Sequence, residues 1–162
     1  MKTLYIVRHG KAMLRAADQM GDYHRTLIEK GINRTKKLVA QLQLMDEKTE
    51  LIISSPAVRA IETAKIIAVD LGYPIEKIQL EEGLYVENEI FMFDLISQIS
   101  EEIDRVMIVG HNPTLTNFLN HFLSPPLDWF KTSSMACLVF ETDDWTEITK
   151  ANNQLVYFYP EK

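Results

Sequence analysis

Cysteine is almost missing from this chain: Cys137 is the single one among 162 residues. A disulfide framework or a thiolate metal cluster within one chain needs several cysteines, so both are excluded. Positive charge is also scarce, because 17 basic residues stand against 23 acidic ones and give a formal net charge of −6. A general nucleic-acid-binding protein needs a basic face, so the composition argues against that class.

Long apolar runs, repeats and Pro-, Gly- or Ser-rich linkers are missing as well. No stretch approaches the ~18–20 apolar residues of a membrane-spanning helix. The run Leu4–Val7 is too short to be the apolar core of a secretory signal. We therefore expect one soluble, cytoplasmic domain over residues 1–162, with neither membrane nor nucleic acid as a partner.

What the chain does contain is an alternation of short apolar runs and longer helical patterns. Hydrophobic residues make up 46% of it and charged residues 25%, which is typical of a globular domain. The runs have the length and composition of buried strands. They are Leu4–Val7, Leu51–Ile53, Val106–Val109 and Ala136–Phe140, with a weaker run at Ile78–Leu80 and a late edge strand at Leu155–Tyr159.

Helix signals lie between these runs. The segment Thr26–Glu29 has the spacing of a capping box and predicts a helix to about Leu44. Ser55-Pro56 and Asn112-Pro113 each combine an N-cap residue with a first-turn proline, and the second predicts a helix through Phe122. Another helix is expected to start near Asn88. The alternation predicts an α/β fold: a single three-layer domain whose mainly parallel central sheet carries helices on both faces.

Polar residues of chemical interest follow the ends of four predicted strands. The carboxyl ends of parallel strands form the ligand crevice of an open sheet, so these residues are expected at one rim. They supply two arginines, two histidines and a carboxylate pair. In chain order they are Arg8-His9-Gly10, Ser54-Ser55-Pro56 with Arg59, Glu81-Glu82, and Gly110-His111-Asn112.

A bound phosphoryl group would account for this collection. Arg59 falls in the first turn of its predicted helix, where a cation opposes the helix dipole. An anion at that helix start would remove the conflict. Taken singly, an Arg-His pair after a strand is ordinary surface, and His111 beside a glycine can be a simple turn residue. Convergence from separate strand ends favours function instead.

Metal and nucleotide sites are poorer explanations of the same residues. The paired histidines show neither His-x-x-x-His nor His-x-His spacing, and neighbouring arginines would repel a cation, so no metal is expected. Gly10-Lys11 lacks the preceding glycine of a P-loop, and the dinucleotide-binding glycine fingerprint is missing.

These motifs, taken in order, resemble a known family. The segment Leu4–Ala12 (LYIVRHGKA) is similar to the opening strand and signature of the histidine phosphatase superfamily, which is phosphoglycerate mutase-like. The whole chain resembles its short SixA-type phosphohistidine phosphatases. The likeness continues through Asp22–Arg25, Ser54–Ala64, Glu82–Tyr85 and Val109–Pro113.

The resemblance implies a role for each of the residues at the rim. His9 would be the nucleophile and would become a phosphohistidine that water then hydrolyses. Arg8, Arg59, His111 and Asn112 would bind the phosphate and stabilise the charge of the transition state. No metal or organic cofactor is then needed.

The general acid and two supporting residues are less defined by the resemblance. By position the acid is Glu82, with Glu81 as the fallback, and two solvated glutamates without any such role remain the alternative. Lys11 and Arg25 also match the pattern, and they would lie at the rim and support the pocket.

Two features favour phosphohistidine on a signalling or phosphotransfer protein as the substrate. Imidazole is a better leaving group than an alkoxide and tolerates a weak acid. About 29 residues separate Glu82 from His111, and one helix and one strand would use nearly all of them, leaving little chain for a lid. The alternatives are a small-molecule phosphomonoesterase of the same superfamily and a non-catalytic phospho-ligand-binding module, which has no need of a nucleophile at His9.

Overall fold

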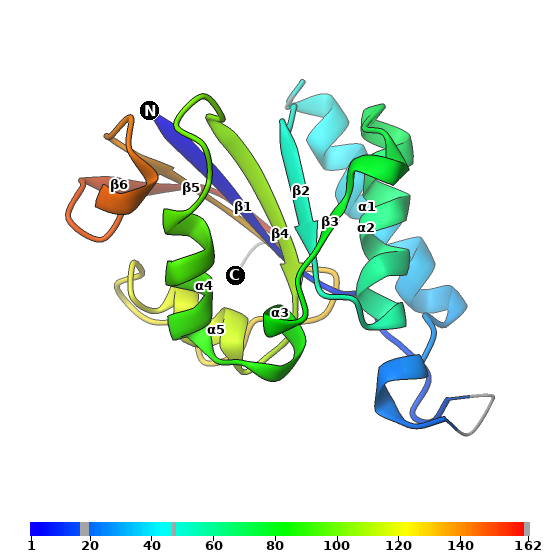
Figure 1. Ribbon diagram of the computed structural model, residues 1–162. Coiled ribbons are helices and arrows are strands. Elements are labelled where there is room, and N and C mark those ends of the chain that lie inside the picture. The colour runs from blue at the N-terminus through cyan, green and yellow to red at the C-terminus, as the bar shows by residue number, and fades with distance from the viewer. Residues whose placement is uncertain (17–19, 47, 161–162) are drawn as a thin grey trace.

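A six-stranded sheet forms the centre of the computed structural model, which describes residues 1–16, 20–46 and 48–160 (Figure 1). The strand order is β3-β2-β4-β1-β5-β6. The first four strands in this order pair in parallel, β5 pairs antiparallel with β1, and β6 pairs antiparallel with β5, as expected for a mainly parallel sheet. The strands are β1 (Lys2–Arg8), β2 (Leu51–Ser54), β3 (Gln79–Leu80), β4 (Arg105–Gly110), β5 (Met135–Phe140) and β6 (Asn153–Tyr159).

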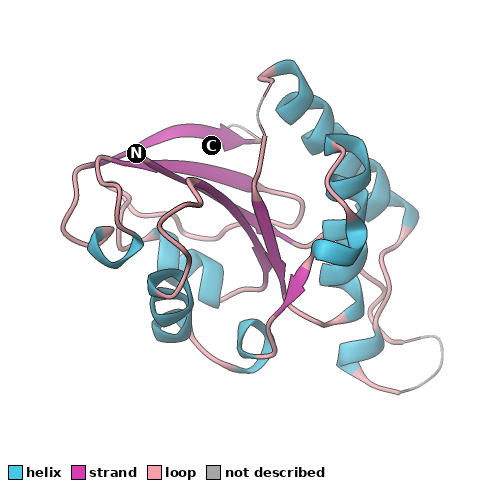
Figure 2. Cartoon of the chain, turned by 45° about the horizontal axis from the view of Figure 1, so that its top comes forward, coloured by secondary structure: helices cyan, strands magenta, loops and turns pink. Residues whose placement is uncertain are grey.

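Helices cover both faces of this sheet, which confirms the predicted three layers (Figures 1 and 2). One face carries α1 and α2, and the other carries α4 and α5. The helices are α1 (Glu29–Leu44), α2 (Val58–Leu71), α3 (Gly83–Val86), α4 (Glu89–Ser97) and α5 (Thr114–Leu119). Short 3₁₀ helices are η1 (Asp22–His24), η2 (Ile75–Lys77) and η3 (Trp145–Glu147).

The central strands are buried on both faces because each face has its own helical layer. Successive side chains of a strand point to opposite faces. In β1, Leu4 and Ile6 join the core under α4 and α5, whereas Tyr5 and Val7 join the core under α1 and α2. This double burial explains why the strands read as unbroken apolar runs.

The capping box predicted at the start of α1 is wrong. The helix begins at Glu29, and its N-cap residue Ile28 makes no side-chain capping bond. Thr26 Oγ1 instead donates to Met13 Sδ at 3.3 Å. The reason is a local pairing of the two chain segments, in which the N–H of Met13 donates to the carbonyl of Thr26 and the N–H of Ile28 to that of Lys11. Extended pairing over these residues delays the helix.

Other predicted helix starts are close to those observed. Asn88 caps α4 as expected, accepting the N–H of Ile90. α2 starts at Val58, so Pro56 precedes the helix, and Ser55 Oγ accepts the N–H of Ala57 at 3.2 Å. The last predicted helix ends early, because α5 stops at Leu119 instead of continuing to residue 122.

No helix in the described ranges combines the length and the apolar character that a membrane crossing needs.

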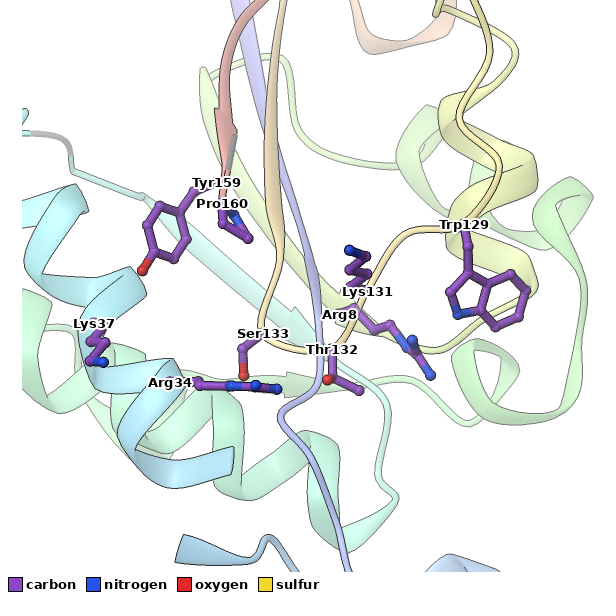
Figure 3. A pocket seen from close by; sticks show the side chains of 9 residues that line it. All are labelled: Arg8, Arg34, Lys37, Trp129, Lys131, Thr132, Ser133, Tyr159 and Pro160. Atoms are coloured by element: carbon purple, nitrogen blue, oxygen red, sulfur yellow. The ribbon is translucent and has the colours of Figure 1, made fainter. Parts of the chain in front are cut away.

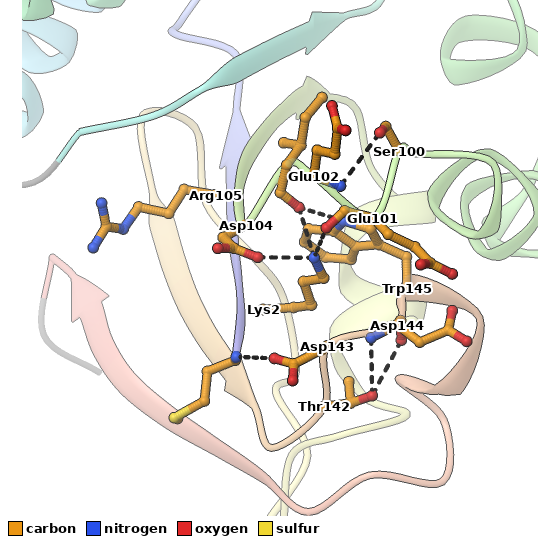
Figure 4. A network of polar contacts seen from close by, with 12 residues as sticks. Lys2, Ser100, Glu101, Glu102, Asp104, Arg105, Thr142, Asp143, Asp144 and Trp145 are labelled. Carbon is orange, nitrogen blue, oxygen red and sulfur yellow. Dashed lines mark hydrogen bonds and ion pairs between the residues drawn. The ribbon is translucent and has the colours of Figure 1, made fainter.

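A buried lysine ties the start of β1 to the turn before β4 (Figure 4). The Lys2 side chain is 0% exposed, and its Nζ lies 5.5 Å from the centroid of the Trp145 ring. Nζ donates to the carbonyls of Glu101 (2.6 Å) and Ile103 (3.0 Å) and to Asp104 Oδ1 (2.8 Å). The methylene stem is therefore packed in the core, while the ammonium group donates three hydrogen bonds.

Replacing this lysine tests how much the network stabilises the fold. We expect Lys2→Met to lower the free energy of unfolding by about 2 kcal/mol, because the apolar stem is kept while charged hydrogen bonds to two carbonyls are lost. Urea denaturation followed by circular dichroism measures this. Lys150→Met is the control: Lys150 is 79% exposed, lies 3.8 Å from Glu147 and should change stability by less than ~0.5 kcal/mol. A Lys2→Met loss no larger than that of the control would contradict the assignment.

Candidate active site

The ends of three adjacent strands bring the predicted site residues together. Arg8 closes β1 and His9 follows it, and His111 follows β4 in the same way. The His9 N–H donates to the Gly110 carbonyl at 3.2 Å. The N–H of Ser55, which follows β2, donates to the Val109 carbonyl at 3.0 Å. The His9 and His111 ring centroids are 4.9 Å apart. The two rim histidines thus lie next to each other, as predicted from their positions after the strand ends.

The hydrogen bond of His9 determines which of its nitrogens is free to react. His9 Nδ1 lies 2.7 Å from the carbonyl oxygen of Gly10. A carbonyl can only accept, so Nδ1 carries the hydrogen of the neutral ring and Nε2 carries the lone pair. The side chain is only 6% exposed. The fold therefore holds a nucleophilic nitrogen in a fixed direction.

Gly10 anchors this loop by fitting closely between two helices. Its N–H donates to Thr63 Oγ1 at 2.9 Å, and that hydroxyl in turn donates to the Arg59 carbonyl at 2.7 Å within α2. On the α1 side the backbones almost touch: a Cβ on Gly31 would lie 2.1 Å from the Lys11 carbonyl oxygen. Only glycine at position 31 allows this approach.

Two arginines are oriented by oxygen atoms of the protein. Arg59 is 5% exposed, and its Nη1 and Nη2 donate to the carbonyl (2.8 Å) and to Oδ2 (3.0 Å) of Asp22. Arg8 Nη1 donates to the Phe130 carbonyl at 3.1 Å, and its guanidinium lies 5.5 Å from the Trp129 ring centroid. Burial and the charge of Arg59 lower the pKa of Arg8. Two like charges are thus held near each other against their repulsion.

Three buried side-chain nitrogens in the described part of the chain have no hydrogen-bond partner, and all belong to this site. They are Arg8 Nε, Arg59 Nε and His111 Nδ1. Buried polar groups are nearly always paired in native proteins, so each exception needs a reason. His111 is held from its other side, where Nε2 lies 2.7 Å from Ser55 Oγ. Unpaired guanidinium N–H groups in a cluster of positive charge are suited to binding an oxyanion.

Both histidines are neutral at physiological pH. Burial is the main cause that lowers the pKa of His9 to about 3, with the charges of Arg59 and Arg8 adding to it against the opposing Gly10 hydrogen bond. Burial, followed by His9 and Arg59, lowers the pKa of His111 to about 3 as well. The Nε2 lone pair of His9 is therefore available throughout the physiological range.

Sequence reasoning did not place Asp22 in the site, although the structure does. Besides Arg59, Asp22 accepts from Tyr85 Oη (2.8 Å) and from Arg25 Nε (2.9 Å). The Tyr85 ring meets the His111 ring edge-on at 5.5 Å. Burial by itself raises the pKa of Asp22, but the Tyr85 hydrogen bond and Arg59 outweigh it and lower the pKa. The signal in the sequence that could have placed Asp22 in the site is its position as the acidic residue of the Asp22–Arg25 motif.

The predicted acids lie at the start of α3. Glu82 is exposed, and its carbonyl accepts the N–H of Tyr85 at 2.9 Å. Glu81 Oε1 accepts from Gln79 Nε2 at 2.7 Å. In the free protein, Asp22 and not this pair is the carboxylate hydrogen-bonded to Arg59.

Asn112 has a structural position in the loop before α5. Its Nδ2 donates to the Phe130 carbonyl, and its Oδ1 accepts from the N–H (3.1 Å) and the hydroxyl (2.9 Å) of Thr116. Asn112 therefore holds the loop after β4 to the segment that also binds Arg8. A contact between Asn112 and phosphate stays a prediction.

Within residues 1–16, 20–46 and 48–160, no group of three or more His, Cys, Asp or Glu side chains could hold a metal ion.

Known proteins resemble this chain in sequence and in fold. Residues 4–85 match the profile of the Histidine phosphatase superfamily (branch 1). An uncharacterized protein of Picosynechococcus sp. is 36% identical over 116 residues, which are 69% of this chain and 67% of that protein.

Two solved structures confirm the expected phosphoglycerate mutase-like α/β fold. The protein histidine phosphatase SixA complexed with tungstate has a TM-score of 0.80 at 21% identity, and the alignment covers 96% of this chain and 95% of the SixA chain. A SixA structure from Agrobacterium tumefaciens has a TM-score of 0.78 at 24% identity, and the alignment covers 97% of this chain and 96% of that chain.

The lowered histidine pKa values predict a loss of stability in acid. Between about pH 6.5 and 3 the unfolded chain binds protons at these positions that the folded chain does not, so stability is complete above that range and falls as the pH drops. Each histidine should contribute a slope on the order of 1 kcal/mol per pH unit near pH 5.

Urea denaturation at several pH values measures this slope in the wild type and in the His9→Asn/His111→Asn double variant. The double variant should show the shallower slope. The exposed His121 provides the control His121→Asn, which should keep the wild-type slope. Equal slopes in the wild type and the double variant would show that the two histidines are not neutral in the folded protein.

Proposed function

The chain belongs to the histidine phosphatase superfamily, and on that premise we propose that it hydrolyses phosphohistidine on a protein through a covalent intermediate on His9. The observation that carries the proposal is the combination of a neutral His9, whose Nε2 keeps its lone pair, with unpaired buried nitrogens on Arg8, Arg59 and His111. A nucleophile and an oxyanion site are needed together for phosphoryl transfer.

The first step is attack by His9 on the bound phosphoryl group. Nε2 forms a bond to phosphorus while the P–N bond of the substrate breaks, and its electron pair leaves with the substrate imidazole. Arg8 and Arg59 carry the positive charge that the phosphoryl oxygens need in the transition state. As Nε2 becomes phosphorylated, the His9 ring gains positive charge, and the Gly10 carbonyl on Nδ1 stabilises that charge.

Hydrolysis of the phosphoenzyme then regenerates the site. A water oxygen bonds to phosphorus, the Nε2–P bond breaks, and its electron pair returns to Nε2. The water oxygen keeps one proton in the product phosphate, and the second proton goes to another phosphate oxygen or to solvent, so the protein ends as it began. Asp22 accepts from both terminal nitrogens of Arg59, which orients the guanidinium and leaves its unpaired Nε for the phosphoryl oxygens.

Proton supply favours an imidazole leaving group over an alkoxide. Asp22 has a lowered pKa and is ionised near neutral pH, so it cannot donate a proton to a leaving group. Glu82, the predicted acid, is exposed. A phosphohistidine protonated on its other ring nitrogen departs as neutral imidazole and needs no proton from the enzyme, whereas an alkyl phosphate must expel a strongly basic alkoxide.

The similar structures and the chain between Glu82 and His111 support a protein substrate. Both solved structures compared above carry the SixA name, and one of them binds tungstate, a tetrahedral oxyanion like phosphate. Two short helices, α3 and α4, and strand β4 occupy most of the connecting chain, where one helix was expected. No inserted lid occurs in this segment, which fits a phosphorylated side chain presented by another protein.

A trapped intermediate tests the proposal directly. Brief exposure to a peptide phosphorylated on histidine should leave acid-labile, alkali-stable phosphate on His9. We expect His9→Ala to abolish both the labelling and turnover, a loss of at least ~10³-fold, because the covalent step needs His9 Nε2 as the nucleophile. His121→Ala, at an exposed histidine outside the site, is the control and should retain full activity. Phosphate binding without any labelling by phosphohistidine or by phosphomonoesters would instead favour a binding module.

The role of Glu82 separates the two enzymatic alternatives. Loss of a general acid typically reduces rates by ~10²–10⁴-fold where the leaving group needs a proton. We therefore expect Glu82→Gln to reduce kcat/KM for alkyl phosphomonoesters strongly and for a phosphohistidine peptide by less than ~3-fold. A panel of sugar and nucleotide phosphates beside the peptide provides the measurement. Equal losses on both substrate classes would contradict the leaving-group argument, and faster wild-type hydrolysis of a sugar phosphate would favour the small-molecule phosphomonoesterase.

A further inference from the structure

A strongly basic hollow lies beside the site, between α1 and the loop that leads into β5 (Figure 3). Its volume is about 550 Å³, and four of its lining side chains are cationic while none is acidic. The complete lining is Arg8, Arg34, Lys37, Trp129, Lys131, Thr132, Ser133, Tyr159 and Pro160. In a chain with a net charge of −6, this concentration of positive charge is unexpected.

The positive charge continues along the outer face of α1. Lys30, Arg34 and Lys37 are spaced by four and three residues, so they share one face of the helix over about 10 Å. These three side chains line a second hollow of about 520 Å³, which adjoins the first through Arg34 and Lys37. We name the whole surface the basic track, defined by Arg8, Lys30, Arg34, Lys37 and Lys131.

The basic track is linked to the backbone of the nucleophile. Ser133, which lines the hollow, donates its N–H to the His9 carbonyl at 3.1 Å, and the Arg8 N–H donates to the Ser134 carbonyl at 3.0 Å. Arg8 itself serves both places, since its side chain lines the hollow and its Nε is one of the unpaired nitrogens of the site. A ligand on the basic track is therefore adjacent to the reacting phosphoryl group.

In the described part of the chain, the cations of the track have no carboxylate partner. None of Arg34, Lys37 and Lys131 forms an ion pair with a residue that the structure describes. Two acids occur at the edges: Glu29 lines the second hollow, and Asp128 lines a further one on the other side of Lys131. Positive charge still exceeds negative charge across the surface, so its potential attracts anions.

We propose that the basic track binds an acidic segment of the protein substrate while the substrate's phosphohistidine reaches His9. This inference rests on the proposed function and names the feature that a substrate must present. A polypeptide fits better than a metabolite, because the positive charge extends over two adjoining hollows and along two turns of α1. Glutamate and aspartate side chains along an extended segment can meet successive cations, and Trp129, which is 52% exposed, offers an apolar contact at the end nearest Arg8.

Binding is tested without turnover by titrating the protein with a short, unphosphorylated, glutamate-rich peptide. Trp129 reports binding by fluorescence, since the other tryptophan, Trp145, is buried. Arg34→Glu/Lys37→Glu should weaken the affinity by at least ~10-fold, and ~0.5 M salt should do the same to the wild type. Lys36→Glu is the matched control, because Lys36 is exposed on α1 but lines neither hollow, and it should change the affinity by less than ~2-fold.

Turnover provides the second measurement, with two histidine-phosphorylated peptides whose flanks carry either glutamate or glutamine. We expect wild-type kcat/KM to favour the glutamate peptide by at least ~10-fold and the Arg34→Glu/Lys37→Glu variant to reduce that ratio to about one. Arg34→Gln/Lys37→Gln should give an intermediate ratio. Lys36→Glu should keep the wild-type ratio.

The outcomes separate this inference from the proposed function. Binding of the acidic peptide without hydrolysis of either phosphopeptide would support the basic track and overturn the phosphohistidine activity. Hydrolysis of both phosphopeptides at equal rates would overturn the basic track and leave the activity standing. An equal effect of Lys36→Glu would show that the peptide responds to the net charge of the protein and not to the basic track. Tight binding of tripolyphosphate with no binding of the peptide would show that the track is a site for small anions. Either result contradicts the proposal.

Discussion

The mutual repulsion of basic groups removed from water is the constraint on which this structure depends. Arg8, His9 and His111 lie at the ends of adjacent strands, and Arg59 lies beside them in the first turn of α2. Arg59 and the two histidines are at least nine-tenths buried. The protein tolerates this in two ways. The histidines give up their protons, as their lowered pKa values show, and the guanidinium groups are held by oxygen atoms of Asp22 and Phe130. On the proposed function, this cluster of donors binds the phosphoryl oxygens without rearrangement when charge develops.

The strand order itself brings the residues of the site together. β2, β4 and β1 are neighbours, so the residues that follow them are joined by main-chain hydrogen bonds before any side chain is considered. The Gly10 loop is then pressed against both α1 and α2, through Gly31 and Thr63. Support of this kind from two helices fixes the direction of His9 Nε2, and precise orientation contributes much of the rate of a displacement reaction. The core that stabilises the fold thus also orients His9 Nε2, the nucleophile of the proposed reaction.

The sequence made some of these features predictable and not others, for physical reasons. Buried strands leave a strong local signature, so the strand positions, the three layers and the convergence of Arg8, His9, Arg59 and His111 could be inferred. The place of Asp22 could not, because its bonds to Arg59 and Tyr85 span 37 and 63 residues and depend on the path of an irregular loop. The capping box failed for a similar reason, since pairing between the segments around Met13 and Thr26 outweighed a local capping preference.

The two positively charged regions of the molecule obey different electrostatic rules, and this difference separates their tasks. At the site Arg59 is buried and Arg8 is partly buried, so their attraction for the phosphoryl group of the proposed substrate is strong and weakly screened. On the basic track Arg34, Lys37 and Lys131 are exposed, where each pair contributes little and salt screens charges beyond a Debye length of about 8 Å at physiological ionic strength. On the proposed function, the chemical step therefore takes place at the buried cluster, which an isolated phosphoryl group can engage. In our proposal the basic track selects among phosphorylated proteins, because its weak contacts add up only when a substrate presents several acidic groups at once.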